Sequence, residues 1–502
     1  MEKDLRNIDI RTWAVLISLL LSVWHVLANP IPNADAFEYV RVAHVSLDEG
    51  IAAAFALYPS ATYPVLMGIV HQLTGLNLLV AGQLINALCF ALLVFSFITL
   101  VQQLRSGPRV TLLAALVILA FPSLNEVRYL LIRDIGFLAL MFSAAVQLVR
   151  FGLTRLPRHA IAFVLLSLGA ALFRAEALAY LPLVPLALLF AGREQWGRNV
   201  RAVLALEAAL LTGGILVLLA GLLTGFDIPG TLQRMLQVYW PFLRDALLAI
   251  SAENSPLSEA IFGEYAANFS DDYLWAFMLA GLTAVLLLSL VEAFGVPALL
   301  LFAWAARRGV PRGNILATRV VLAYALVGFL VLLGFLVLTR FLATRYTLLF
   351  CLMILTFLPL ILDRAWSAAT GSLRPRLWRG LLIFLLLFSA VDAHISFGKS
   401  KESLQQASDW LQHNTQEGTM VLTNSPYVAY FSGRVADYDK VFRYLADDAI
   451  VNASFGTIIV LAPTRGIDAQ IQHNLEFRRI EPLAQFPADG EPEVFVFRRL
   501  GN

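Results

Sequence analysis

Charged side chains are scarce in this 502-residue sequence: Asp, Glu, Lys and Arg together make up 14% of it, whereas 59% of the residues are hydrophobic. Soluble domains usually carry about 25% charged residues, so the composition excludes an ordinary soluble protein. The formal net charge is only +2, which gives no reason to expect a nucleic-acid partner. The composition instead predicts an integral membrane protein.

Cysteine is nearly absent as well. The two cysteines, Cys89 and Cys351, both lie inside apolar stretches. We therefore predict packing residues buried in the membrane, rather than a disulfide or a metal-binding pair.

Long apolar runs are what the sequence has in abundance. A helix needs about 20 apolar residues to cross the hydrocarbon core, and on that criterion the chain is expected to be a polytopic α-helical membrane protein with about eleven spans. The long run 273–306 is expected to tilt, to bend at Gly295–Pro297 or to extend past the bilayer. The predicted spans are 12–28, 78–103, 109–124, 134–150, 159–173, 177–192, 200–224, 273–306, 316–338, 345–362 and 378–396.

Positive charge in the short loops is unevenly distributed. Most Lys and Arg residues lie in the N-terminal segment and in the loops on its side of the membrane, for example Arg105, Arg155, Arg307 and Arg374. Because such residues mark the cytoplasmic side, the N-terminus is predicted to be cytoplasmic. An odd number of spans then places the C-terminus on the extracytoplasmic side.

The chain divides by composition into two parts. Residues 1–397 are predicted to form the transmembrane part, with long outer loops at 29–77 and 225–272. The first loop contains apolar pieces at 51–57 and 63–70 that are too short to span, which predicts interfacial helices. Residues 398–502 are typical of a soluble α/β domain, with a helix over 400–413 and strands over 419–423, 457–462 and 493–497.

Polar residues from distant loops are predicted to lie on the same outer face. Carboxylates can take a proton from a hydroxyl or amine acceptor, and arginines can hold a phosphate bidentately. Charge at this face, with few charges inside the spans other than Glu207 and Glu292, favours an enzyme over a transporter. The candidates are Asp35, Glu38, Arg128, Arg133, Asp134, Arg174, Glu176, Arg340 and Arg345.

Each candidate also has a purely structural interpretation. Asp35 and Glu38 have the spacing of a helix N-cap and its capping-box partner. Arg133 with Asp134, and Arg174 with Glu176, could be ion pairs at helix ends, and an arginine at an outer helix end such as Arg345 is often a snorkelling anchor.

The outer-loop motifs resemble those of the GT-C glycosyltransferases, in particular the protein mannosyltransferase and aminoarabinose transferase branch. Asp35-Ala-Phe-Glu-Tyr39, the Tyr/Pro-rich stretch from Tyr58 to Pro64 and then Gly75 are similar to that branch's first outer loop. Arg133-Asp134 and Arg345-Tyr346 fall where the family has a second acid and an Arg-Tyr pair. The segments 423–426 and 432–434 resemble the opening of its periplasmic domain. In many members the first two acids are adjacent, whereas here Glu38 follows Asp35 by three residues.

This resemblance implies a sugar donor linked to a polyprenyl phosphate, undecaprenyl phosphate in a bacterium, and an acceptor at the outer side of the inner membrane. It implies Asp35 as the base, with Asp134 as a second acid that orients the acceptor or binds a metal, and Glu38 as a further catalytic candidate. Family members differ in metal use, so a divalent metal ion is left open. The implied binding residues for the lipid phosphate and sugar are Arg128, Arg133, Arg174, Arg345, Tyr39, Tyr58, Tyr63 and Tyr346.

Three other functions remain open from the sequence. A transporter or flippase of lipid-linked saccharides would bind similar groups without making a bond. A polymerase or ligase of surface glycans would carry out a different transfer on a similar scaffold. A non-catalytic membrane scaffold with an extracytoplasmic binding domain would use neither chemistry.

Overall fold

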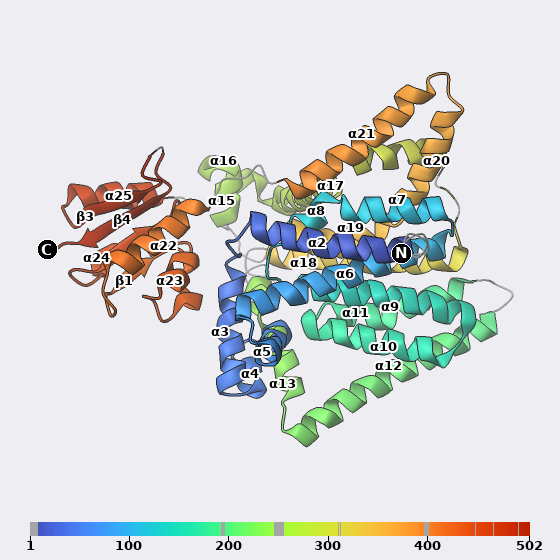
Figure 1. The fold of residues 1–502 in the computed structure, drawn as a ribbon, viewed down its shortest axis with the longest axis horizontal. Helices are drawn as coiled ribbons and strands as arrows, with labels where there is room; N and C mark the ends of the chain where they lie inside the picture. The colour runs from blue at the N-terminus through green and yellow to red at the C-terminus, as the bar shows by residue number, and fades with distance from the viewer. Residues whose placement is uncertain are drawn as a thin grey trace, which may run out of the picture.

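The computed structural model describes residues 9–191, 196–244, 256–309, 311, 313–395, 401–446, 448–464, 466–489 and 491–501. Most of these residues form a helical bundle, and a small domain built on a sheet lies at one end of it (Figure 1). The bundle helices are α2 (Ile10–Ala28), α6 (Leu78–Leu104), α7 (Pro108–Leu119), α9 (Asp134–Thr154), α10 (Pro157–Phe173), α11 (Ala177–Leu183), η1 (Val184–Ala191), α12 (Trp196–Thr224), α17 (Leu274–Arg308), α18 (Ile315–Thr339), α19 (Thr344–Leu355), α20 (Leu358–Thr370) and α21 (Pro375–His394).

Seven helices among the described residues are long and apolar enough to cross a membrane, and α19 with α20, which meet at a 48° bend, make up to eight. The chain is therefore a multi-pass membrane protein. The expected count of eleven is not confirmed, because the runs expected near 109–124, 159–173 and 177–192 form shorter apolar helices. The bend expected in the long run 273–306 is confirmed at Gly295, which is non-helical inside α17.

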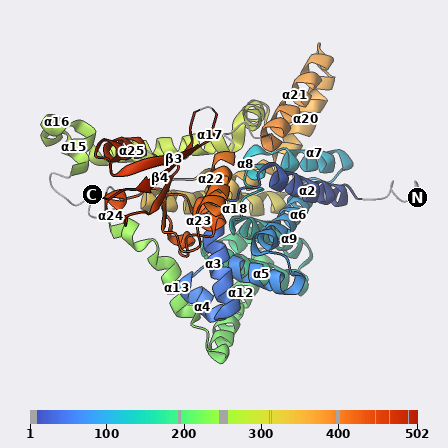
Figure 2. The ribbon, with the colours of Figure 1, turned by 60° about the vertical axis from the view of Figure 1, so that its left-hand side comes forward.

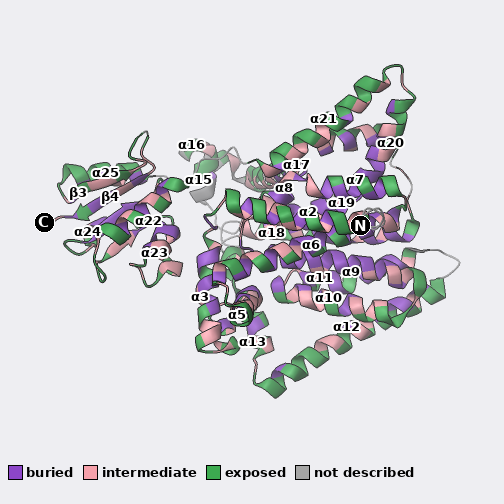
Figure 3. Ribbon diagram, in the orientation of Figure 1, coloured by how far each residue is buried: buried purple, intermediate pink, exposed green. Residues whose placement is uncertain are grey.

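Whether an apolar residue of the bundle is buried depends on whether its helix lies at the centre or the edge of the bundle. The buried side chains of α6 and α9 form the centre of the core, whereas α12 and α21 present mostly exposed residues along their length (Figure 3). Leu211, Leu222 and Phe384 are examples of large apolar side chains left uncovered. In a spanning helix such a surface is solvated by lipid, so its exposure has no cost.

Several short helices lie at the end of the bundle that faces the small domain. α3 (Asp35–Asp48), α4 (Ile51–Leu57) and α5 (Thr62–Thr74) run across the ends of α2 and α6 (Figures 1 and 2). They confirm the helices predicted for loop 29–77. The loop 225–272 contains α13 (Ile228–Gln237), α15 (Pro256–Phe262), α16 (Glu264–Ser270) and part of η3 (Asp271–Tyr273), and its residues 245–255 lie outside the described ones. A further short helix, α8 (Pro122–Asn125), precedes α9.

The small domain holds a four-stranded sheet in the order β1-β2-β4-β3. β1 (Val421–Thr423) and β2 (Ile458–Leu461) are parallel, and β4 (Val494–Arg499) pairs antiparallel with β2 and with β3 (Ile480–Phe486). The three predicted strands correspond to β1, β2 and β4, but β3 was not predicted. Pro482 and its polar neighbours break the strand pattern there, and an edge strand with a register shift at Pro482/Ala484 tolerates them.

The helices of this domain are α22 (Glu402–Asn414), α23 (Pro426–Ser432), η4 (Tyr438–Lys440), α24 (Ala449–Asn452) and α25 (Ile467–Glu476). Its hydrophobic core includes two residues from the membrane part, Ile31 and Phe37. The Phe37 ring contacts Tyr430 and Phe431 at centroid distances of 5.1 and 6.0 Å. The small domain is thus joined to the first turn of α3 by apolar packing.

Candidate functional site

A side-chain clamp brings two outer loops together. The Asn33 amide donates to the Leu131 carbonyl at 3.1 Å and accepts from the Leu131 backbone N–H at 2.8 Å. A second amide, that of Asn86, donates to the carbonyl of Leu130. The Asn33 bonds hold the turn before α9 against the start of α3, and the Asn86 bond holds the same turn against α6. The neighbourhoods of Asp35 and Asp134 thereby become one site.

Asp35 is the first residue of α3 but not its cap. The N-cap position is Ala34, and Asp35 makes no capping hydrogen bond. Its carboxylate instead accepts a charge-assisted hydrogen bond from Arg345 Nη1 at 2.9 Å. The capping-box interpretation is therefore wrong. Residues of the first outer loop and of the first turn of α19 meet as an ion pair that is only partly exposed.

Arg174 forms the second polar centre, at the end of α10. Its Nη1 pairs with Asp134, while its Nη2 and Nε donate to Glu176 at 2.7 and 3.3 Å. The sequence suggested the Arg174–Glu176 pair, which is confirmed. An Asp134–Arg133 pair is not what forms, because the partner of Asp134 is Arg174.

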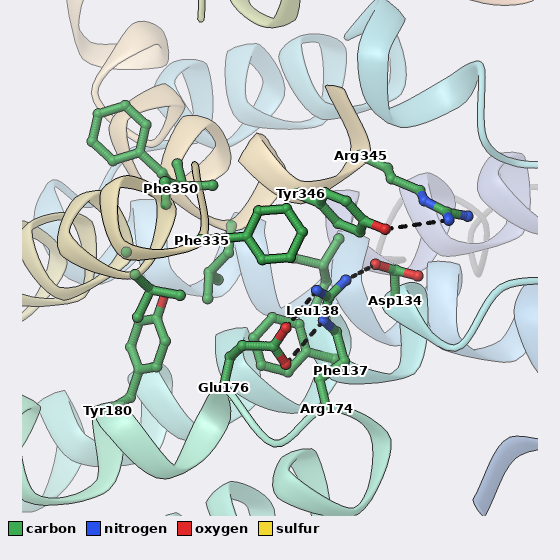
Figure 4. Close-up of a pocket in the computed structure, with 14 residues that line it drawn as sticks. Asp134, Phe137, Leu138, Arg174, Glu176, Tyr180, Phe335, Arg345, Tyr346 and Phe350 are labelled. Carbon is green, nitrogen blue, oxygen red and sulfur yellow. Dashed lines mark hydrogen bonds and ion pairs between the residues drawn. The ribbon is translucent and has the colours of Figure 1, made fainter. Parts of the chain in front are cut away.

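Tyr346 lies between the two arginines. The Arg174 and Arg345 guanidinium groups lie 4.9 and 5.3 Å from the centroid of its ring. A cation over an aromatic face at this range is attracted by the ring quadrupole. The Tyr346 side chain therefore joins the Asp35–Arg345 pair to the Asp134–Arg174–Glu176 cluster. Figure 4 shows Tyr346 with the two arginines, Asp134 and Glu176.

A cavity opens beside this cluster (Figure 4). Its polar wall is made by Asp134, Arg174, Glu176 and Arg345, and the remainder is apolar. The apolar wall comes from α9, α11, α18 and α19 and includes Phe137, Leu138, Tyr180, Phe335, Leu349 and Phe350. Ionised groups therefore line one wall and hydrocarbon the other of a small cavity, whose volume of about 40 Å³ is enough for a few water molecules.

The pKa of two acids at the site is displaced in opposite directions. Burial acts to raise the pKa of Glu176, but the Arg174 guanidinium outweighs it and the pKa falls to about 2. The pKa of Glu38 is raised, because its carboxylate is partly desolvated and lies near Asp35, which Arg133 only partly offsets. Glu176 therefore stays ionised, whereas Glu38 is held closer to the protonated form.

A third group surrounds Arg133, which lies over the Tyr58 ring at 5.7 Å. The Tyr39 ring contacts those of Tyr58 and Tyr63 at 6.0 and 5.4 Å. Tyr63 is buried and donates to the Gly82 carbonyl at 2.9 Å, so its hydroxyl is used in packing α5 onto α6. Tyr39 and Tyr58 thus support Arg133 at the edge of the site.

Arg128 is not brought to the cluster. It is 2% exposed, and its Nη1 donates to Ser18 and Ser22 of α2 while Nε and Nη2 donate to Asn125. Its guanidinium also lies 4.3 Å from the centroid of the Phe90 ring. The side chain thus fastens α8 to α2 inside the bundle, away from the cavity.

Two residues at the site had no chemical role in the sequence-based prediction. Glu176 was a candidate with an ion pair to Arg174 as its structural interpretation, and Tyr239 was not among the candidates. The Tyr239 hydroxyl lies 3.4 Å from Glu176 Oε1. An aromatic residue beside charge marks the membrane interface in general, so the sequence offered no signal that was specific for this contact.

A divalent metal ion does not fit the carboxylates as they are arranged. In the described part of the chain, no three His, Cys, Asp or Glu side chains converge as a metal site. Asp35 and Asp134 each face an arginine, whose positive charge already balances the carboxylate.

Only the comparison with solved structures found similar proteins. No protein-family model matches the sequence, and no curated protein matches it. ArnT from Cupriavidus metallidurans in the apo state is similar in structure, with a TM-score of 0.54 and 12% sequence identity over 97% of this chain and 97% of that chain. This chain has a GT-C-like fold.

A second solved structure agrees. It is the archaeal oligosaccharyltransferase AglB from Archaeoglobus fulgidus in complex with an inhibitory peptide and a dolichol-phosphate. The TM-score is 0.51 and the identity 12%, over 97% of this chain and 74% of AglB. At 12% identity the similarity establishes the fold. A shared fold does not by itself assign an activity.

Proposed function

We propose that this chain is a membrane glycosyltransferase that uses a sugar carried on a polyprenyl phosphate. The acceptor would be glycosylated at the membrane face that bears the small C-terminal domain. We propose a bacterial inner membrane with undecaprenyl phosphate as the carrier, a cytoplasmic N-terminus and an extracytoplasmic C-terminus. The observation that supports this most is the Asp35–Arg345 pair, which sets a carboxylate and a guanidinium beside a cavity with one ionised and one apolar wall.

Asp35 is proposed as the base. Its side chain is 38% exposed, so an acceptor can reach it while Oδ2 stays on Arg345. The carboxylate takes the proton of an acceptor hydroxyl or amine as the acceptor oxygen or nitrogen attacks the anomeric carbon of the sugar. The bond from this carbon to the phosphate oxygen breaks, and the carrier leaves as polyprenyl phosphate.

Arg345 and Arg133 are proposed to bind the phosphate. Only Nη1 of Arg345 is used by Asp35, and Nη2 lies 3.5 Å from the Tyr346 hydroxyl, a weak contact that a phosphate can replace. A guanidinium fork matches two phosphate oxygens and stabilises the charge that develops on the leaving group. The apolar wall would take the first part of the polyprenyl chain once the cavity, about 40 Å³ in this structure, widens around the carrier.

Arg174 has a positioning role in this proposal. Its Nε, Nη1 and Nη2 all donate to Glu176 or Asp134, so the guanidinium is committed to those two carboxylates. Asp134 then acts as an orienting acid whose place is fixed by Arg174. The cation also lies over the Tyr346 ring, which holds that ring against Arg345.

Transfer, transport and polymerisation give different products. The protein is reconstituted into liposomes with an undecaprenyl-phosphate-linked sugar and a membrane extract as the acceptor source, and free undecaprenyl phosphate is measured. A transferase releases the carrier and loses this activity in Asp35→Asn. A flippase moves the donor across the bilayer without release, which would refute the proposal. A polymerase would give products that lengthen in repeat units.

A further inference from the structure

A second, larger hollow lies on another side of the bundle. It is a groove of about 740 Å³ between α17, α21 and the turn from α7 to α8. Val296, Phe384 and Phe388 contribute to its walls and are each at least half exposed. Because α17 and α21 are both long and apolar enough to span, we expect this groove to face the hydrocarbon of the bilayer.

The break in α17 shapes this groove. Gly295 has φ +71° and ψ 157°, and Pro297 lies two residues further on, so the helix is interrupted where it lines the hollow. Ser123 Oγ donates to the Ala293 carbonyl at 2.8 Å, which satisfies one carbonyl near the break. Irregular backbone at membrane depth is tolerated only where it is buried or lines a cavity.

Two carboxylates contribute to the lining of the groove. Glu292 and Asp392 line it, and their negative charges, after desolvation by burial, contribute to raising the pKa of Glu126. Within the described ranges, no Lys or Arg side chain forms an ion pair with any of the three. Thr344 Oγ1 donates to Glu292 Oε1 at 3.2 Å, which fixes one of these carboxylates beside the start of α19.

We propose that this groove binds a phospholipid with a primary ammonium head, such as phosphatidylethanolamine. One acyl chain lies along α17 and α21, and the ammonium group lies between Glu292 and Asp392. An ammonium carries three N–H donors and no acceptor, which matches a mouth made of carboxylate oxygens. A quaternary choline head lacks these donors, and an anionic glycerol head would be repelled.

The site is distinct from the cavity proposed for the carrier phosphate. Thr344 precedes Arg345 in the chain, so the lipid head would lie at the other flank of the α19 N-terminus. The proposal requires only lipid binding and does not depend on glycosyl transfer. Its failure would therefore leave the proposed function untouched, and the converse also holds.

Native mass spectrometry of the full-length protein tests the proposal, with dioleoyl phosphatidylethanolamine, phosphatidylcholine and phosphatidylglycerol titrated in turn. We expect the first bound lipid to be phosphatidylethanolamine, roughly tenfold tighter than either of the others, as hydrogen bonds to charged groups would give. The double variant Glu292→Gln with Asp392→Asn should lose this preference while still binding lipid chains. Equal affinity for the three lipids in the wild type would overturn the proposal, as would a preference that survives in the double variant.

Matched variants separate the groove from the general surface. Asp48→Asn removes an exposed carboxylate outside the groove and should leave the preference unchanged. Ser389→Trp fills the groove and should abolish the first binding event for all three lipids, whereas Leu387→Trp adds the same bulk on α21 away from the lining. If Ser389→Trp binds lipid like Leu387→Trp, the groove is not the site. Thermal unfolding in detergent confirms that each variant is folded.

Discussion

Asp35 and Arg345 stand 310 positions apart in the chain, and their side chains form an ion pair with an Nη1–Oδ2 distance of 2.9 Å. The bond between them uses only one carboxylate oxygen of Asp35 and one guanidinium nitrogen of Arg345. The carboxylate keeps one oxygen for an acceptor, and the guanidinium keeps N–H groups for a phosphate. The pair therefore holds the proposed base next to the residue proposed to stabilise the leaving group, before any substrate binds.

The first prediction concerns Asp35. Asp35→Asn should reduce turnover by about 10²- to 10⁴-fold, because the amide cannot take the acceptor proton. The variant should insert and unfold like the wild type, since the partly exposed pair with Arg345 contributes little stability. Release of polyprenyl phosphate by the reconstituted protein is the measurement, with Asp48→Asn on the same helix as control. Near-normal turnover would show that Asp35 is not the base.

Arg345 carries the second prediction. Arg345→Lys keeps the charge but loses the planar fork, so donor binding should weaken roughly tenfold or more. The loss should appear in KM for the lipid donor and in direct binding of undecaprenyl phosphate. Arg340→Lys changes an exposed arginine at the end of α18 and provides the control. Unchanged donor affinity in Arg345→Lys would move the phosphate site to Arg133.

Much of the architecture could be predicted because it is encoded locally. Apolar runs specify the spanning helices, and the short pieces at 51–57 and 62–74 form helices because they carry helical patterns too short to span. The count of eleven spans is not confirmed where the apolar helices are short, as in α7 and α10. A hydropathy run does not reveal how much of its length is helical.

The site could be predicted only as a set of residues on one face. Which carboxylate pairs with which arginine depends on contacts such as Asn33 with Leu131, and these are not visible in local pattern. Arg128 shows the limit most clearly. Its partners Ser18 and Ser22 lie inside the first span, and the sequence does not indicate that these serines accept hydrogen bonds from an arginine.

The third prediction follows from the lowered pKa of Glu176. Its folded pKa of about 2 lies below the ordinary value of 4.5, so ionised Glu176 contributes stability above about pH 4.5 that is lost as the pH falls toward 2. The contribution should be roughly 1–3 kcal/mol. Glu176→Gln should therefore have a lower thermal midpoint than the wild type at pH 7, and the two midpoints should converge at low pH. Glu49→Gln, at an exposed position, should follow the wild type, and a constant difference across the range would contradict the assignment.

The last prediction concerns Phe37, which lies between Asp35 and Glu38 and is 1% exposed. Its ring belongs to the core of the C-terminal domain, so one turn of α3 carries both the proposed base and the contact that holds that domain. Phe→Ala in a core typically costs about 3–5 kcal/mol, and here the cost falls on the contact between the two parts. Phe37→Ala should make residues 402–501 more sensitive to limited proteolysis and should lower kcat, while binding of undecaprenyl phosphate at Arg345 persists. Phe442→Ala removes a ring that is 76% exposed and should change neither readout. If Phe37→Ala leaves both the cleavage rate and turnover unchanged, the C-terminal domain does not position Asp35.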